Sequence, residues 1–337
     1  MHANAAIRLL AHYRKTARAL PWRAMPGDTP PDPYRVWLSE VMLQQTTVAA
    51  VAPRFERFVA RWPTVEALAA APDADVLSEW AGLGYYARAR NLIACARQVA
   101  AQGGFPTTEC ELRALPGIGA YTAAAIAAIA FGRRAVVIDT NVERIIARLH
   151  AIEQPIADAR PQIRVLAEAM TPQQNAGDFA QAMMDLGATI CRPRAPDCTA
   201  CPLNAHCAAL ASGNPEAFPG RSAKRQRPLR HGIARWIERD GAVWLVRRPE
   251  RGMLGGMAAL PGPDWSDDPL PLNGAPLAQL RHVFTHFALD LTVIGASEPT
   301  GEGWWQPLDR IGDVGLPTLY RRAAELVLAK RNADLAA

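Results

Sequence analysis

The sequence predicts a mainly α protein, in which an all-helical first domain precedes a smaller domain of mixed α and β structure. Up to about residue 212, Ala-rich stretches carry apolar residues at three- and four-residue spacing, and Pro or Gly separates them. A segment rich in Gly, Pro and Arg then interrupts this pattern at residues 213–230, which we interpret as a linker. Short apolar runs follow it. The length of 337 residues also suits two domains.

The charge balance permits a polyanionic partner without requiring one. Lys and Arg number 37 against 32 Asp and Glu, which gives a net charge of +5. Residues 217–237 contain six basic and no acidic side chains. Such a run is either a solvated linker or a surface that contacts phosphates. No apolar run approaches the roughly 18 residues of a membrane span, so we expect no membrane partner.

The helical domain contains a helix that carries a candidate acid. Asp32 and Pro33 suit the N-cap and the first position of this helix, which we expect to run through Trp37 and Val41 as far as Val48. Glu40 lies on it between apolar neighbours. A partly buried carboxyl has a raised pKa and can donate a proton near neutral pH. The alternative is an ordinary solvated helix glutamate.

Two glycines mark a tight turn between helices. Thr108 and Glu111 have capping-box spacing, and Leu115-Pro116-Gly117-Ile118-Gly119 separates their helix from the Ala-rich stretch 121–130. Gly117 and Gly119 would let the backbone approach a ligand closely, and the next helix N-terminus suits a phosphate. An ordinary inter-helix turn is the alternative.

Asp139 is a second candidate carboxylate. It follows the apolar run 136–138 and precedes a helix with apolar residues at Val142, Ile145 and Leu149. Asp is well suited to cap that helix, which is the purely structural interpretation. Two carboxyl groups in different environments are also what breaking a glycosidic bond requires.

Four of the six cysteines fall within seventeen residues. Cys191, Cys198, Cys201 and Cys207 have the spacing C-x6-C-x2-C-x5-C, whereas Cys95 and Cys110 stand alone. Clustered thiols in a long chain indicate a metal site, and spacing alone leaves an iron–sulfur cluster and zinc both open. Free thiols also favour a reducing compartment, so we expect a cytoplasmic protein.

The second domain shows strand patterns. Segments 232–238 and 242–247 flank Asp240-Gly241, which predicts a hairpin. Further strands are expected at 281–284 and 289–294, and a final helix at about 316–330.

Together these residues resemble a known family. The carriers are Leu20-Pro21-Trp22-Arg23, the Ser39–Thr46 segment, Gly82–Tyr86, the Leu115–Gly119 turn, Asp139–Val142, Gln181–Gly187 and the four cysteines. The chain resembles the helix-hairpin-helix DNA glycosylases with an iron–sulfur cluster, and among them the adenine DNA glycosylase (MutY) family. The resemblance implies a helical domain over 1–212, with the helix-hairpin-helix at about 108–130 and a cluster loop at 191–207, and a Nudix-like domain over 231–337.

The resemblance implies an activity and roles for the candidate residues. The expected enzyme removes adenine mispaired with 8-oxoguanine, or with guanine, from duplex DNA, acts as a monomer and holds a [4Fe–4S] cluster. Glu40 would protonate N7 of adenine and later activate water. Asp139 would stabilise the oxocarbenium ion, with Tyr121 and Asn141 supporting it.

Further residues would form the substrate site by the same resemblance. The wall around the extruded base would comprise Leu20, Trp22, Arg23 and Asp185. Gln45 and Tyr85 would probe the duplex, and Phe284-Thr285-His286 would contact 8-oxoguanine, although the family usually has Ser at the middle position. Glu143 would place a negative charge near DNA. Segment 252–262 contains no carboxylate, so we expect no nucleotide hydrolase activity.

Three alternatives compete with this interpretation. An endonuclease III-like glycosylase and lyase acting on oxidised pyrimidines would carry a catalytic lysine just after the turn, where this chain has Tyr121. A non-catalytic iron–sulfur DNA-binding module would need neither Glu40 nor Asp139. An electron-transfer iron–sulfur protein would have no use for the glycine turn.

Overall fold

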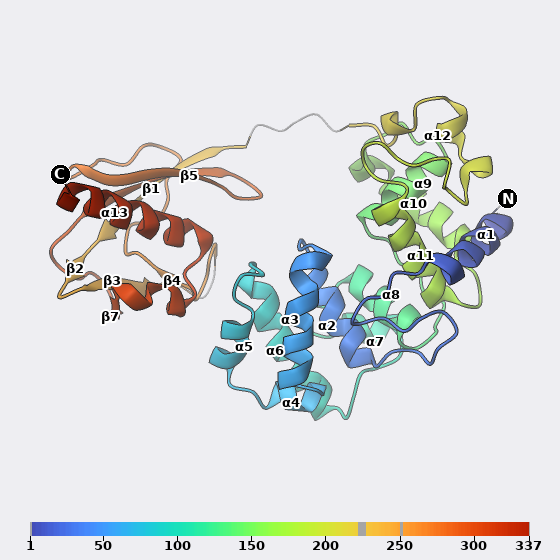
Figure 1. Ribbon diagram of the computed structural model, residues 1–337, viewed down its shortest axis with the longest axis horizontal. Coiled ribbons are helices and arrows are strands. Elements are labelled where there is room, and N and C mark those ends of the chain that lie inside the picture. Colours follow the sequence, from blue (N-terminus) through green and yellow to red (C-terminus); the bar gives the residue numbers. More distant parts are fainter. Residues whose placement is uncertain (1, 222–226, 250–251, 337) are drawn as a thin grey trace. The chain divides into compact units, whose positions relative to one another are not determined.

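The computed structural model describes residues 2–221, 227–249 and 252–336, and the chain divides into two compact units (Figure 1). The first unit spans Met1–Ala223 and the second Lys224–Ala337. Of the predicted linker at 213–230, residues 222–226 lie outside the described residues, including Lys224 and Arg225. No helix of the described chain is both long enough and apolar enough to cross a membrane.

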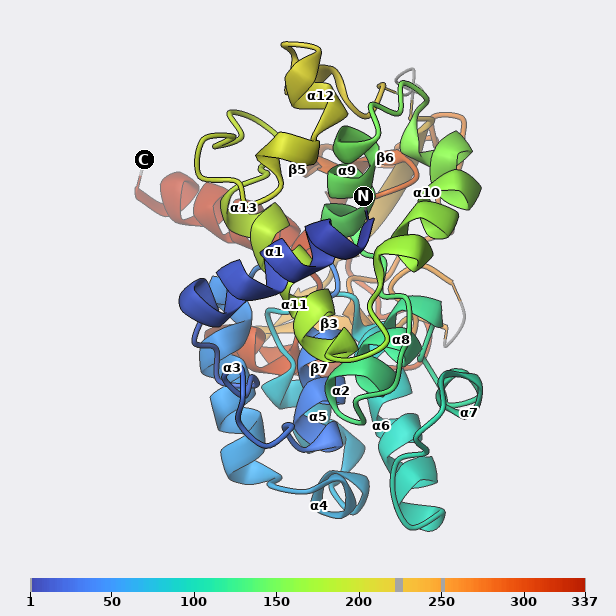
Figure 2. The ribbon, with the colours of Figure 1, turned by 90° about the vertical axis from the view of Figure 1, so that its right-hand side faces the viewer.

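The described part of the first unit is built from helices joined by loops (Figure 2). The helices are α1 (His2–Thr16), α2 (Pro33–Leu43), α3 (Val48–Arg61), α4 (Val65–Ala69), α5 (Asp73–Glu79), α6 (Tyr86–Ala101), α7 (Glu109–Arg113), α8 (Ala120–Ile129), α9 (Thr140–Leu149), α10 (Ile156–Met170), α11 (Ala176–Thr189), α12 (Ala208–Ala211) and the 3-10 turns η1 (Asn204–His206) and η2 (Pro215–Ala217).

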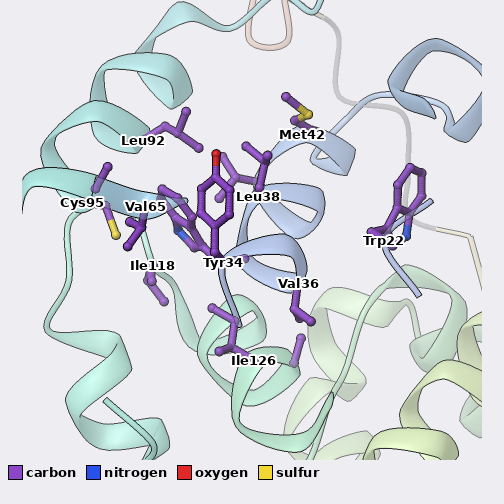
Figure 3. Close-up of a cluster of buried hydrophobic side chains, with 14 of the residues drawn as sticks. Trp22, Tyr34, Val36, Leu38, Met42, Val65, Leu92, Cys95, Ile118 and Ile126 are labelled. Carbon is purple, nitrogen blue, oxygen red and sulfur yellow. The ribbon is translucent and has the colours of Figure 1, made fainter. Parts of the chain in front are cut away.

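Two hydrophobic cores hold these helices together. One lies between helices α2 to α8 and is rich in aromatic side chains such as Trp37, Phe55 and Trp80. Figure 3 shows part of this core, around Tyr34 and Leu38. The other joins α1 with α9, α10 and α11. The Ala-rich α8 is buried on every side from Thr122 to Ile129. The absence of a side chain at Gly177 lets α11 approach the α8 backbone closely, because a Cβ there would lie 2.5 Å from the Ala128 carbonyl oxygen.

The helix that carries Glu40 ends earlier than its apolar pattern predicts. As expected, Asp32 caps α2 by accepting a hydrogen bond from the Tyr34 amide at 2.8 Å. The helix stops at Leu43, however, and Val48 belongs to α3. Two features separate them: Gln45 has a φ of 56°, and the Thr47 hydroxyl caps α3. A side-chain cap outweighs an apolar spacing that runs across it.

The predicted glycine turn joins α7 to α8. Thr108 caps α7, and its hydroxyl donates to the Glu111 carboxylate at 2.6 Å. Gly117 requires the absence of a side chain, because its φ is 73° and a Cβ would lie 2.6 Å from Cβ of Asn91. Gly119 begins α8 without any side-chain cap. The first amides of α8 are therefore free to meet a ligand.

The described part of the second unit holds two small sheets and one long helix (Figure 1). Its elements are β1 (Leu229–Trp236), β2 (Glu238–Arg239), β3 (Ala242–Arg247), β4 (Ala258–Ala259), β5 (Pro276–Val283), β6 (Ala288–Gly295), β7 (Gly303–Pro307), the 3-10 segment η3 (Leu308–Val314) and α13 (Thr318–Ala336). One sheet has the order β1-β6-β5, with β1 parallel to β6 and β5 antiparallel to it. In the other, β3 pairs with β2, β4 and β7.

The hairpin predicted at Asp240-Gly241 is present, although its first strand is short. Both turn residues have positive φ, 50° and 71°, and β2 pairs with β3 across them. Most of the segment predicted as the first strand instead forms β1, which pairs with β6. The run 232–238 is thus divided between two sheets, since only its last residues face β3.

Candidate active site

A cavity of about 980 Å³ lies within the first unit and collects most of the predicted site residues. Its lining includes residues of α2, the loops before α3 and α6, and the N-terminal ends of α8 and α9. The predicted residues in this lining are Leu20, Trp22, Arg23, Glu40, Gln45, Tyr85, Tyr121, Asp139 and Asn141. Segments from residue 20 to residue 141 therefore converge on one space.

Glu40 is almost completely buried in the wall of this cavity. The residue is 6% exposed, and the Tyr121 hydroxyl donates a 2.6 Å hydrogen bond to its Oε2. Burial raises the pKa of Glu40 to about 7, while the Tyr121 hydrogen bond and the charge of Arg23 oppose the rise and Asp139 adds to it. A carboxyl with this pKa can both give and take a proton near neutral pH.

Asp139 combines the structural and the functional interpretation of its position. It is the N-cap of α9, and its Oδ1 accepts a hydrogen bond from the Val142 amide at 2.7 Å. Its Oδ2 accepts a second from Nδ2 of Asn141 at 2.8 Å. The carboxylate nevertheless lines the cavity with Glu40. Capping therefore fixes its orientation rather than removing it from the site.

Asp185 supports the cavity wall rather than forming it, which corrects the sequence-based prediction. The residue is 7% exposed and is absent from the cavity lining. Its carboxylate binds two arginines that do line the cavity, Arg23 at 2.8 Å and Arg18 at 2.6 Å. Burial raises the pKa of Asp185, but the hydrogen bonds and charges of Arg23 and Arg18 outweigh burial and hold it below its usual value. Asp185 thus fixes two guanidinium groups.

Trp22 has both of the roles that its position allows. It is a core residue whose ring packs edge-on against Phe55, with 5.3 Å between centroids. It also contributes to the cavity lining beside Leu20. A wall residue anchored in the core presents a rigid surface to a bound ring.

Gln45 and Tyr85 project from two loops at the cavity. Both have left-handed backbones, with φ of 56° and 50°, and Tyr85 is 54% exposed. Non-glycine residues rarely adopt this conformation, and it concentrates at functional sites. The two residues predicted to probe DNA therefore lie at turns with a rare backbone conformation, and both are exposed to solvent.

The four clustered cysteines lie on the segment that follows α11. All four are free and partly buried, and in the described chain no group of three or more Cys, His, Asp or Glu could hold a single metal ion. The thiols influence one another: the pKa of Cys201 is raised to about 11, mainly by burial, and the charges of the other three cysteines contribute to the rise. Four thiols on one short segment are a donor set that either an iron–sulfur cluster or a zinc ion could use.

Two arginines of α9 fasten this cysteine segment. Arg148 is buried and donates to Sγ of Cys191 at 3.4 Å and to the Arg192 carbonyl at 2.7 Å. Arg144 donates to the Cys191 carbonyl at 2.9 Å and to Oδ1 of Asn141 at 2.8 Å. Since Asn141 in turn binds Asp139, one side chain joins the cysteine segment to the cavity.

In the second unit, Phe284-Thr285-His286 forms the turn between β5 and β6. Phe284 stacks on Trp265, with 5.4 Å between centroids and an interplanar angle of 29°, and it also contacts Phe287. Thr285 and His286 are exposed at the tip. Phe284 anchors the turn, and its two polar neighbours are free to contact a ligand.

Comparisons with known proteins assign the chain to a family. Residues 38–168 match the HhH-GPD superfamily of base excision DNA repair proteins, and residues 233–326 match the NUDIX domain. The adenine DNA glycosylase of Buchnera aphidicola (strain Sg) is 30% identical over 87% of this chain and 91% of its own length. That of Mycolicibacterium smegmatis is 40% identical over 65% of this chain and 74% of its own.

This chain belongs to the adenine DNA glycosylase family. The human adenine DNA glycosylase is 34% identical over 85% of the chain, and the match spans 66% of the human protein. Among solved structures, a thermostable thymine-DNA glycosylase is 28% identical over 61% of this chain and 95% of its own, with a TM-score of 0.54. An endonuclease III in a DNA complex shares the fold, at 24% identity over 63% of this chain and 99% of its own and a TM-score of 0.52.

In this family member, the structure adds site residues that the sequence alone did not indicate. Arg18, Gln44, Gln181 and Met184 also line the cavity, and Gln181 is 6% exposed. The sequence-based prediction chose Asp185 from the segment that contains Gln181. The two lie one helical turn apart, and only the packing of α11 determines which reaches the cavity. A polar residue one turn before Asp185 was the available signal.

Glu143 forms an ion pair with a basic residue of α10. Its carboxylate accepts a hydrogen bond from Nε of Arg160 on α10 at 3.1 Å, and both residues line the cavity. The expectation that Glu143 places a negative charge near DNA stays a prediction, and the structure adds that Arg160, which is distant in sequence, supplies a counter-ion.

Proposed function

We propose that this chain is a monofunctional DNA glycosylase that removes adenine mispaired with 8-oxoguanine, or with guanine, from duplex DNA. The observation that carries the proposal is the pair of unlike carboxyl groups in one cavity. Glu40 has a pKa of about 7 in a buried position, and Asp139 is oriented by the Val142 amide and by Asn141.

The chemistry follows from this difference. Protonated Glu40 donates its proton to a ring nitrogen of the base, which can then leave as a neutral molecule. The sugar left behind develops positive charge, and the Asp139 carboxylate stabilises that charge. Glu40 is now a carboxylate and can take a proton from the attacking water. The hydrogen bond from Tyr121 stabilises this charged form of Glu40.

The base must leave the duplex before it can reach Glu40. Extrusion costs a few kcal/mol and is easiest at a mismatch. A cavity of about 980 Å³ has room for a nucleotide, and its wall offers the Trp22 ring and the guanidinium of Arg23. Gln45 and Tyr85 would fill or test the duplex beside the extruded base. The uncapped N-terminus of α8 after Gly119 suits a DNA phosphate.

The residue that follows the glycine turn favours simple hydrolysis over a lyase reaction. A lyase forms a Schiff base with a lysine, and this chain has only Lys15, Lys224 and Lys330. Lys15 and Lys330 are not in the cavity lining, Lys224 lies outside the described residues, and Tyr121 occupies the position after the glycine turn. We therefore expect the reaction to stop at an abasic site.

Recognition of the opposite base is assigned to the second unit. The exposed Thr285 and His286 supply a hydroxyl and an imidazole at the tip of a turn that Phe284 anchors. Either can hydrogen bond to the added oxygen or nitrogen-bound hydrogen of 8-oxoguanine. The hydroxyl of Thr serves as that of Ser would. We also propose that the protein acts as a cytoplasmic monomer.

Cys191, Cys198, Cys201 and Cys207 would hold a [4Fe–4S] cluster. When bound, such a cluster would fix the segment that follows α11 and could exchange single electrons. Arg144 and Arg148 would support it, as they already bind the Cys191 carbonyl and Sγ.

A single-turnover cleavage assay tests the proposed function. The substrate is a duplex with adenine opposite 8-oxoguanine, incubated with the wild-type protein or Glu40→Gln and then analysed with and without hot alkali. We expect strand breaks only after alkali and only with the wild type. Breaks without alkali would replace the proposal with a lyase. Tight DNA binding without base loss would indicate a non-catalytic binding protein.

A further inference from the structure

One arginine of the cavity lining that the sequence analysis did not name holds both loops from which Gln45 and Tyr85 project. Arg88 lies in the first turn of α6, three residues after Tyr85. Its guanidinium donates to acceptors from three segments: the carbonyls of Val41 at 2.9 Å and Met42 at 3.1 Å, Oγ1 of Thr46 at 3.3 Å, and the carbonyls of Leu83 at 2.9 Å and Gly84 at 3.3 Å.

Each group of acceptors belongs to a functional element. Val41 and Met42 are the last turn of α2, directly after Glu40, and their carbonyls have no partners within a helix that ends at Leu43. Thr46 is adjacent to Gln45. Gly84 is adjacent to Tyr85. The rigid, planar guanidinium of Arg88 therefore binds the C-terminal carbonyls of α2, the helix that carries Glu40, and joins that helix to both loops.

Aromatic rings enclose the same guanidinium. Its central carbon lies 5.2 Å from the centroid of Trp80 and 5.5 Å from that of Tyr85. The indole nitrogen of Trp80 also donates to the Gly84 carbonyl at 3.0 Å. Arg88 thus contacts the ring of Tyr85, and it also holds the backbone beside Tyr85 through the Gly84 carbonyl.

The location of Arg88 is otherwise unfavourable. A cation in the first turn of a helix faces the positive end of the helix dipole. Burial also lowers the pKa of Arg88, which shows that its charge is poorly solvated. The five hydrogen bonds and two ring contacts offset these costs. A lysine at this position would carry the same charge without the planar fork that reaches three segments at once.

We propose that Arg88 is a positioning residue. It couples Gln45 and Tyr85, the two loop residues predicted to probe the duplex, to the end of the helix that carries Glu40. The inference rests on the proposed function, because Gln45 and Tyr85 can act on a duplex only if the protein binds one. Because Gln45 and Tyr85 would be held at a fixed distance from Glu40, a base that they extrude would enter the cavity with the Glu40 carboxyl already positioned beside it. Arg88 touches neither the base nor the sugar in this scheme.

The test compares Arg88→Lys with Arg97→Lys, a matched change at an exposed arginine on the same helix. Single-turnover rates are measured on adenine opposite 8-oxoguanine and on adenine opposite an abasic analogue, where less pairing must be broken. Base extrusion is followed separately by the fluorescence of 2-aminopurine in place of adenine. Each protein is first shown to be folded by its thermal transition.

We expect Arg88→Lys to lower the rate on the paired adenine by about 10- to 100-fold and to reduce the 2-aminopurine signal. The loss opposite the abasic analogue should be several-fold smaller, and the pH midpoint of the rate near 7 should stay where it is. Arg97→Lys should behave as wild type. Equal losses on both substrates, or unchanged extrusion, would overturn the proposal.

A milder variant keeps the test decisive if Arg88→Lys does not fold. Thr46→Val removes one acceptor beside Gln45 and preserves shape. It should show a smaller loss with the same dependence on substrate, and equal losses on both substrates would again contradict the coupling. Failure of the proposed function would look different: the wild type would then release no adenine from either duplex.

Discussion

The hydroxyl of Tyr121 donates a 2.6 Å hydrogen bond to Oε2 of Glu40, across 81 positions of sequence. Burial raises the pKa of Glu40 to about 7, and this hydrogen bond is the largest of the effects that oppose the rise. The pair therefore sets the pH at which a single group can act first as an acid and then as a base.

Removing this hydrogen bond should move the pH profile of base release. In Tyr121→Phe the carboxylate loses a partner, so the pKa of Glu40 should rise by about one unit, and the descending limb of the single-turnover rate should move to higher pH. We expect the maximal rate to fall about tenfold, because the carboxyl is less firmly oriented. Tyr34→Phe is the control, since that hydroxyl binds the Trp62 carbonyl in the core. An unmoved limb would contradict the assignment.

The buried Glu40 should also limit the stability of the folded protein at high pH. A carboxyl whose folded pKa is raised from 4.5 to about 7 favours the folded state less as pH increases from 4.5 to 7. Glu40→Gln should remove this dependence and raise the free energy of unfolding at pH 8 by up to about 3 kcal/mol. Urea unfolding of both proteins between pH 4.5 and 8 measures this. Parallel curves would mean that Glu40 is solvated.

Breaking the Asp185 ion pairs should destabilise the wall of the cavity. Asp185→Asn leaves Arg18 and Arg23 without their buried counter-ion, which should cost about 3 kcal/mol at pH 7. Because the folded pKa of Asp185 is lowered, the wild type should lose this advantage as pH falls below 4, and the two proteins should converge there. The exposed pair Arg57–Glu79 provides the control, and Glu79→Gln should cost under about 1 kcal/mol.

A methyl group at Gly187 should disturb catalysis through Asn141. A Cβ at Gly187 would lie 2.4 Å from Cβ of Asn141, so α9 or α11 must shift. Gly187→Ala should cost about 1–3 kcal/mol of stability and lower the single-turnover rate, because Asn141 orients Asp139. Gly312→Ala, which has open space at that position, should alter neither. A destabilised variant with the wild-type rate would show that Asn141 is not needed to hold Asp139.

Arg144 should influence both the proposed cluster and the cavity. Its bonds to the Cys191 carbonyl and to Asn141 cannot both be made by a shorter amide, so Arg144→Gln should lower the iron content of the purified protein as well as the rate. Iron is measured against protein concentration, and the rate is expressed per cluster. Arg164→Gln, at an exposed position on α10, is the control. Full iron content together with the wild-type rate would contradict the connection.

The sequence by itself determined the fold class, the family and most of the cavity. Local features carry these conclusions: the apolar spacing of the helices, the Asp32 and Asp139 caps, the Gly117 turn and the cysteine spacing. Each depends on residues within a few positions of one another, where backbone geometry restricts what the chain can do. Ordered motifs then placed Glu40, Tyr121 and Asn141 in one family pattern.

Only the tertiary structure decided which side chains meet. Asp185 and Gln181 are both polar and lie on neighbouring turns of α11, and the packing of this helix brings Gln181 to the cavity and leaves Asp185 to bind Arg18 and Arg23. Glu143 found its counter-ion on α10, and Arg88 found its acceptors on three segments. Such partners are distant in sequence, and a buried charge has a low free energy only where the fold supplies its complement.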